Sequence, residues 1–168
     1  MRIILIGFMG SGKTVVGKSL ANKLNIKFID MDTEIEKREK KTISNIFKEH
    51  GEDYFRKLES NLLKGLVEED NVVISTGGGI ITRQENIDIL KREKKVIFLD
   101  ANVQTIQKNV SKEINKRPLL KESNSIYDTI NSLLRKRYDK YNSICDMKIS
   151  INDKNINDVV SEILVYIR

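Results

Sequence analysis

Five short apolar runs rich in β-branched residues recur along the chain, separated by longer stretches in which apolar positions repeat every three or four residues. Runs of this length and composition are typical of β-strands, and the stretches between them have the period of amphipathic helices. The alternation predicts an α/β fold in which helices cover both faces of a parallel sheet. The predicted strands comprise residues 2–6, 26–30, 71–76, 96–100 and 146–151.

Two of the predicted helices are defined by their apolar stripes. Apolar residues between Ile156 and Ile167 follow the i, i+3, i+4 spacing closely, which predicts an amphipathic C-terminal helix. A second helix, over about residues 126–141, carries a stripe into whose middle Arg137 falls at the helical period. An inward guanidinium is costly unless it meets an anion, so Arg137 is a candidate anion ligand.

The first predicted strand runs directly into the sequence GFMGSGKT at residues 7–14, and a helical pattern follows. This is a complete phosphate loop in the context that the motif requires, namely strand, loop and helix. Backbone N–H groups of such a loop wrap a phosphate, and the helix N-terminus adds its partial positive charge. Lys13 would reach the β- and γ-phosphates and the Thr14 hydroxyl would ligate Mg²⁺. We therefore expect a nucleoside triphosphate to bind here.

Composition and charge narrow the class of protein. The chain has 168 residues, 39% of them apolar and 32% charged, as expected of one globular domain. The net charge is +6, but basic runs such as Lys37-Arg38-Glu39-Lys40-Lys41 are broken by acids and no aromatic pattern resembles a base-stacking platform, so we expect no nucleic-acid partner. No apolar run could span a membrane, the first strand leaves no room for a signal peptide, and Cys145 is the only cysteine. These features predict a cytoplasmic protein, and none of them demands a partner chain, so we expect a monomer.

The second predicted strand ends in two carboxylates, Asp30 and Asp32. In an extended backbone this spacing places both on one side, at the strand end where parallel sheets bind ligands. Phosphoryl transfer needs one carboxylate near Mg²⁺ and one near the acceptor hydroxyl. Alternatively, Asp32 caps a helix that begins at Thr33. We favour the functional interpretation, because capping by Asp32 leaves Asp30 unexplained.

Arg56 is a second candidate anion ligand, three residues before Glu59, which falls on a buried apolar helix face. The pair forms either a structural salt bridge or a rigid bidentate grip on a ligand carboxylate, and the spacing leaves both open.

The third strand ends at three consecutive glycines, residues 77–79, which suit close backbone approach to a ligand or simply a flexible turn. Together, two arginines, exposed N–H groups and an aspartate imply a small hydroxylated acid as acceptor.

In their order and spacing these motifs resemble the shikimate kinase family over essentially the whole chain. The resemblance implies a P-loop nucleoside-monophosphate-kinase-like fold, a three-layer α/β/α sandwich with a central five-stranded parallel sheet. It implies a single domain over residues 1–168, with a lid at about 109–123 and a substrate-binding region at about 32–60. The motifs are GFMGSGKT, Asp30-x-Asp32, Phe55-Arg56-x-x-Glu59, Gly77-Gly78-Gly79, Arg117-Pro118-Leu119-Leu120 and Arg137-x-x-x-Tyr141.

The resemblance also implies an activity and a role for each site residue. The activity would be Mg²⁺-dependent transfer of the ATP γ-phosphate to the 3-hydroxyl of shikimate, on the route to chorismate and the aromatic amino acids. Lys13 would stabilise the transferring phosphoryl group, Asp32 would bind hydroxyls and serve as base, and Arg117 would neutralise phosphate charge from the lid. The implied ATP ligands are Gly10, Ser11, Gly12, Lys13, Thr14, Val15, Arg117 and Lys154; the substrate ligands are Asp32, Arg56, Gly78, Gly79 and Arg137, beside Phe47 and Phe55; the metal ligands are Thr14 and Asp30.

Two alternatives remain at this point. Gluconate kinases share the fold and also act on a polyhydroxy acid, but they differ at the triple glycine and at Phe55-Arg56-x-x-Glu59. A nucleotide-switched protein that binds nucleic acid through its basic surface is the second alternative. It would leave the Asp30/Asp32 pair and the inward Arg137 without a purpose.

Overall fold

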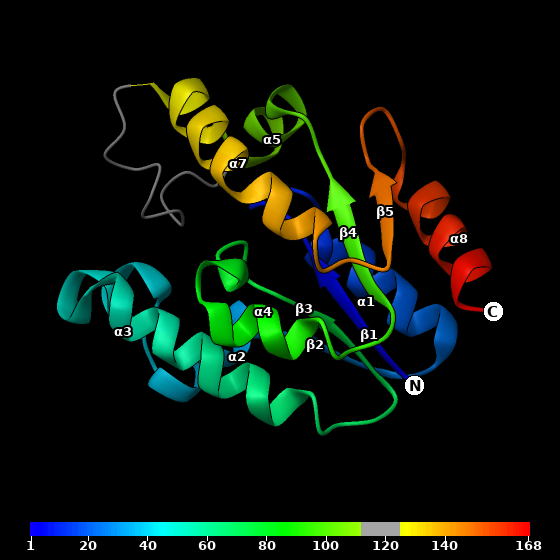
Figure 1. Ribbon diagram of the computed structural model, residues 1–168, viewed down its shortest axis with the longest axis horizontal. Coiled ribbons are helices and arrows are strands. Elements are labelled where there is room, and N and C mark those ends of the chain that lie inside the picture. Colours follow the sequence, from blue (N-terminus) through cyan, green and yellow to red (C-terminus); the bar gives the residue numbers. More distant parts are fainter. Residues whose placement is uncertain (112–124) are drawn as a thin grey trace.

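The computed structural model describes residues 1–111 and 125–168, which form a five-stranded parallel sheet between two layers of helices (Figure 1). The strand order is β2-β3-β1-β4-β5. The α/β class, the five strands and the central parallel sheet are therefore confirmed, and no strand end differs from its predicted position by more than one residue. The strands are β1 (Arg2–Ile6), β2 (Lys27–Asp30), β3 (Val72–Ser75), β4 (Val96–Asp100) and β5 (Met147–Ser150).

The helices include both of those predicted from apolar stripes, at the C-terminus and near residue 126. The longest helix is kinked at Gly51, whose φ of 81° lies in the left-handed region. Among the described residues, no helix is both long and apolar enough to cross a membrane. The helical elements are α1 (Lys13–Leu24), α2 (Met31–Glu39), α3 (Ile43–Leu66), η1 (Ile80–Thr82), α4 (Gln84–Leu90), α5 (Val103–Val110), α7 (Ile126–Asn142) and α8 (Ile156–Ile167).

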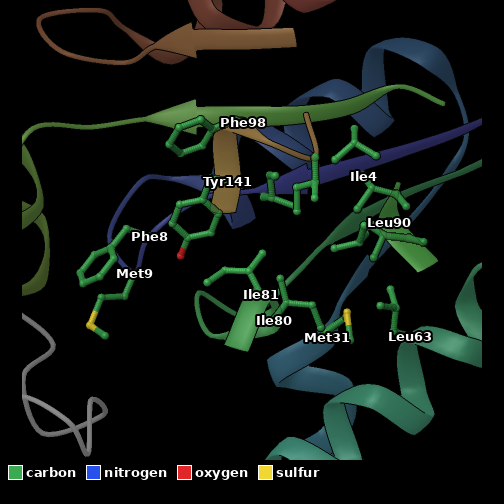
Figure 2. Close-up of a cluster of buried hydrophobic side chains, with 14 of the residues drawn as sticks. Ile4, Phe8, Met9, Met31, Leu63, Ile80, Ile81, Leu90, Phe98 and Tyr141 are labelled. Atoms are coloured by element: carbon green, nitrogen blue, oxygen red, sulfur yellow. The ribbon is translucent and has the colours of Figure 1, made fainter. Parts of the chain in front are cut away.

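Side-chain alternation along the strands divides the core into two layers. In β1, Ile3 and Leu5 face α1 and α8, whereas Ile4 and Ile6 face the layer that contains α2, α3, α4 and α7. Figure 2 shows part of the second layer, in which Met31 and Leu63 lie beneath the sheet and Tyr141 lies beside Phe98. Strands buried on both faces have no polar side, so they appear in the sequence as continuous apolar runs.

The carboxyl ends of the parallel strands meet at one edge of the sheet. The phosphate loop follows β1, Asp30 ends β2, and the glycine turn at residues 77–79 follows β3. The strand register pairs Asp30 with Ser75, and Ser75 with Leu5 on its other side. The topology therefore brings three motifs that are far apart in the sequence to adjacent strand ends.

The buried layer beneath the sheet gives a direct test of core stability. Leu63 is 0% exposed, so Leu63→Ala should lower the free energy of unfolding by about 2–5 kcal/mol through lost burial and a residual cavity. Val165 is 73% exposed, and Val165→Ala should change the free energy of unfolding by no more than about 0.5 kcal/mol. Guanidinium chloride unfolding of both variants measures the difference. Equal losses would contradict the assigned layers.

Candidate active site

The phosphate loop connects β1 to α1 through left-handed glycines. Gly10 and Gly12 have φ values of 74° and 81°, a left-handed backbone conformation that would be strained in a residue with a side chain. A Cβ atom on Gly10 would lie 2.7 Å from Val110, and the Gly10 carbonyl accepts a hydrogen bond from Asn109 Nδ2 at 2.8 Å. The end of α5 therefore lies directly on the loop. Ser11, which is part of the loop, is fully buried.

Lys13, the first residue of α1, is only 7% exposed. Its Nζ donates to the carbonyls of Gly7 at 2.8 Å and Phe8 at 2.9 Å, so the ammonium lies against the phosphate-loop motif. The next residue, Thr14, donates from Oγ1 to Asp30 Oδ2 at 2.6 Å. Val15 lies in the first turn of α1, and its side chain is 52% exposed.

Asp30 corrects one expectation. The backbone does not stay extended to Asp32, because Asp30 itself is the N-cap of α2 and its Oδ1 accepts from the Thr33 N–H at 3.1 Å. The helix therefore begins at Met31, and Asp32 projects from its first turn. Capping does explain Asp30, contrary to the inference from spacing. Its second oxygen nevertheless holds Thr14, so one carboxylate serves both contacts.

Arg56 is buried in an ion-pair network on α3. Its Nη1 donates to Glu59 Oε2 at 2.5 Å, and its Nε and Nη2 donate to Glu52 Oε1 at 3.2 and 3.0 Å. Burial opposes the charge of Arg56, but these carboxylates outweigh it and raise its pKa, so the guanidinium stays charged. Three of its five N–H donors are used in these bonds, which leaves two for a ligand. The salt bridge and the ligand grip are thus compatible.

Glu59 is the most deeply buried carboxylate of this site. It is 0% exposed, and its Oε1 has no hydrogen-bond partner among the described residues. Burial raises its pKa to about 7, and the charge of Asp32 acts in the same direction, although Arg56 opposes both. A carboxyl group that is only partly ionised at neutral pH is therefore held between Arg56 and Asp32.

The glycine turn after β3 brings these groups together. A Cβ on Gly77 would lie 2.3 Å from Glu59 Oε1 and 3.0 Å from Asp32 Oδ1, and a Cβ on Gly79 would lie 2.2 Å from Arg56 Nη1. The intervening Gly78 faces the phosphate loop, where its Cβ would lie 2.9 Å from the backbone nitrogen of Met9. Each glycine therefore allows a contact that a side chain would block.

Arg137 enters the same region from α7, as its place in the apolar stripe predicted. It is 6% exposed, its Nη1 lies 3.4 Å from the Gly78 carbonyl oxygen, and its guanidinium lies 5.6 Å from the centre of the Phe8 ring. Asp32, Arg56 and Arg137 thus gather around one turn that abuts the phosphate loop. Phe47 and Phe55 lie together nearby, with ring centres 5.1 Å apart.

One other expected residue, Lys154, lies away from the glycine turn. Lys154 follows β5, two strands from the phosphate loop, and forms an ion pair with Glu162 at 2.6 Å. Residues 112–124 are outside the described residues, and they include Arg117 and the greater part of the lid expected at about 109–123.

Two contacts of the site were not predicted from the sequence. Glu52 binds Arg56 from one helical turn before it, and the i, i+4 spacing was the available signal. The Tyr141 hydroxyl donates to the Gly78 carbonyl, whereas in the sequence Tyr141 stood out only as the last residue of the Arg137-x-x-x-Tyr141 motif. Its signal was the same spacing, four residues after Arg137.

A phosphate-loop motif and a cluster of buried charges at the same edge of this sheet are typical of the P-loop kinases with a nucleoside-monophosphate-kinase-like fold. Within that class, the sequence profile of the shikimate kinase family matches residues 9–168, and this chain belongs to that family. A shikimate kinase of Clostridium botulinum (strain Eklund 17B / Type B) is 44% identical over 162 residues, which are 96% of this chain and 94% of that protein.

Solved structures agree with this assignment. A shikimate kinase from Acinetobacter baumannii in complex with shikimate has a TM-score of 0.95 and 34% identity, covering 99% of this chain and 92% of its own. The enzyme from Aquifex aeolicus has a TM-score of 0.82 and 41% identity, covering 99% and 96%. A gluconokinase from Sinorhizobium meliloti, with a TM-score of 0.60 and 14% identity, shares the fold alone.

The buried Glu59 predicts a pH dependence of stability. Its folded-state pKa of about 7 exceeds the ordinary value of 4.5, so the folded state holds the proton more tightly. Stabilisation that is complete below pH 4.5 is therefore lost as the pH rises through 7. Relative to Glu59→Gln, the wild-type protein should lose of the order of 3 kcal/mol of unfolding free energy between about pH 4.5 and 8. Guanidinium chloride unfolding across this range measures the loss, and a constant difference would contradict it.

Proposed function

We propose that this protein transfers the γ-phosphate of ATP to the 3-hydroxyl of shikimate, releasing ADP and shikimate 3-phosphate. The observation that carries the proposal is the convergence of Asp32, Arg56 and Arg137 on the glycine turn that abuts the phosphate loop. Two guanidinium groups match one carboxylate, and an aspartate matches hydroxyl groups. Shikimate carries both on one small ring.

The nucleotide would bind through the loop at residues 7–14. The N-terminus of α1 and the backbone N–H groups of the loop would hold the phosphates. These N–H groups include those of Gly10, Ser11, Gly12 and Val15. The Lys13 ammonium would exchange its two carbonyl acceptors for phosphate oxygens, a short movement for a flexible stem. We assign Arg117 and a lid at about 109–123 to the phosphates, and Lys154 to the adenine side.

The residues present fit a magnesium ion. The Thr14 hydroxyl and the Asp30 carboxylate lie 2.6 Å apart, and both are the oxygen donors that Mg²⁺ prefers. Thr14 and Asp30 would hold the ion, which when bound neutralises charge on the phosphates.

The acceptor would be held by its carboxylate and its hydroxyl groups. Arg56 and Arg137 would grip the carboxylate together with the Gly78 and Gly79 N–H groups. Asp32 would bind the hydroxyls and accept the proton of the attacking one as its oxygen bonds to phosphorus and ADP leaves. The network around Arg56 holds its guanidinium in place before the substrate arrives, so little ordering is needed on binding.

We propose that the enzyme acts as a cytoplasmic monomer without nucleic-acid or membrane partners. Within residues 1–111 and 125–168, several surface lysines form ion pairs with nearby carboxylates, which weakens their attraction for a polyanion. Examples are the ion pairs Lys27–Glu69, Lys41–Glu49, Lys57–Asp53 and Lys64–Glu85.

An assay of ADP release tests the proposed acceptor. With ATP and Mg²⁺, shikimate should stimulate release and gluconate should not. The Lys13→Ala variant should lose nearly all of the stimulated rate, because it removes the ammonium that lies at the Gly7 and Phe8 carbonyls and would bind the phosphates. Stimulation by neither acid, or a rate in the variant within a few-fold of wild type, would contradict the proposal.

Replacing Arg137 tests the carboxylate grip. Arg137→Lys should raise the KM for shikimate at least about tenfold, because an ammonium does not reproduce bidentate binding. Arg135→Lys is the matched control, since Arg135 is exposed on the same helix. Steady-state kinetics with saturating ATP measures both. Equal KM values would assign Arg137 a structural role.

A further inference from the structure

Tyr141 is a buried polar group that the proposed chemistry does not use. Its side chain is 0% exposed, and its ring stacks on Phe98 with centres 5.0 Å apart and planes at 25°. Its hydroxyl donates to the carbonyl oxygen of Gly78. Figure 2 shows Tyr141 beside Phe98, with the hydroxyl pointing away from that ring toward Ile81. Burial raises the pKa of Tyr141, so the hydroxyl remains a donor.

The bond to the Gly78 carbonyl orients a whole peptide group. The Gly78 carbonyl and the Gly79 N–H belong to one planar unit, and no peptide bond is cis, so the two point in opposite directions. Holding the oxygen against α7 therefore aims the Gly79 N–H away from α7. Gly79 lies directly against the Arg56 guanidinium.

The turn itself supplies no other hold on this peptide. The carbonyls of Gly77 and Gly79 accept from Ile80 and Thr82 within the turn, at 3.2 and 2.9 Å, whereas that of Gly78 is bound from α7. The contact from Arg137 to the same oxygen is long, at 3.4 Å. Tyr141 thus provides the stronger bond, one helical turn after Arg137.

The amide groups on this turn are available for a ligand. Within residues 1–111 and 125–168, the N–H groups of Gly78 and Gly79 have no protein acceptor. Two N–H donors beside two guanidinium groups form an anion-binding arrangement, and its precision depends on how firmly the peptide is held.

We propose that Tyr141 is a positioning residue, whose hydroxyl holds the Gly78 carbonyl and so directs the Gly79 N–H toward the carboxylate of the acceptor. This inference rests on the proposed function. It assigns to Tyr141 part of the affinity for the acid and none of the affinity for the nucleotide.

Tyr141→Phe removes the hydroxyl and keeps the ring. The expected result is an increase of about tenfold in the KM for shikimate, with kcat and the KM for ATP within twofold of wild type, the pattern of a lost binding interaction. Tyr138→Phe is the matched control. Its ring also contacts Phe98, at 5.8 Å, but its hydroxyl bonds to Asp100 at 3.2 Å and not to the turn. It should retain wild-type constants.

Wild-type turnover separates the two proposals. If the wild-type protein does not phosphorylate shikimate, the proposed function fails. If it does, and Tyr141→Phe has a shikimate KM within twofold of Tyr138→Phe, the positioning role is overturned. Equal increases in the KM for ATP and shikimate would also overturn it, because a general packing defect affects both.

A measurement on the wild-type protein covers the case in which the variant does not fold. The chain has nine glycines, so ¹⁵N-glycine labelling gives a simple amide spectrum. Saturating shikimate should shift the Gly79 amide resonance and slow its hydrogen exchange at least tenfold. An unchanged Gly79 resonance in protein that turns over shikimate would overturn the proposal.

Discussion

The Gly77–Gly79 turn lies against two carboxylates, a guanidinium group and the phosphate loop, and this close approach requires that all three residues lack side chains. Any Cβ here would lie within 3 Å of one of these neighbours. The distance between the proposed acceptor-binding charges and the phosphate loop is therefore set by backbone contact. In phosphoryl transfer such positioning is the larger part of what the protein contributes.

The same packing buries charges that would otherwise be solvated. Arg56, Glu59 and Arg137 are each at most 8% exposed, and a buried charge destabilises a fold unless it is paired. Two apolar layers on either side of the sheet supply the compensating stability. Burial raises the pKa of Glu59 to about 7, so the carboxyl group stays partly protonated at neutral pH and less charge is buried.

Local patterns predicted the strands and the inward direction of Arg137 correctly, because strand and helix periods decide which side chains are buried. They were wrong at Asp30 and Asp32, where a two-residue spacing suggested an extended backbone. A side-chain bond to the Thr33 N–H starts the helix there instead. Both conformations fit the same residues, so the choice depends on which hydrogen bonds the surrounding fold completes.

The sequence by itself determined the phosphate loop, the five strands and the identity of the charged groups, since each depends on residues close together in the chain. Only the tertiary structure decided that Tyr141 meets the Gly78 carbonyl, 63 residues away, and that Asp32 and Glu59 converge on Gly77. Contacts of this kind depend on strand order and helix packing. The spacing of these residues along the chain did not indicate either contact, because both contacts join elements that are far apart in the sequence.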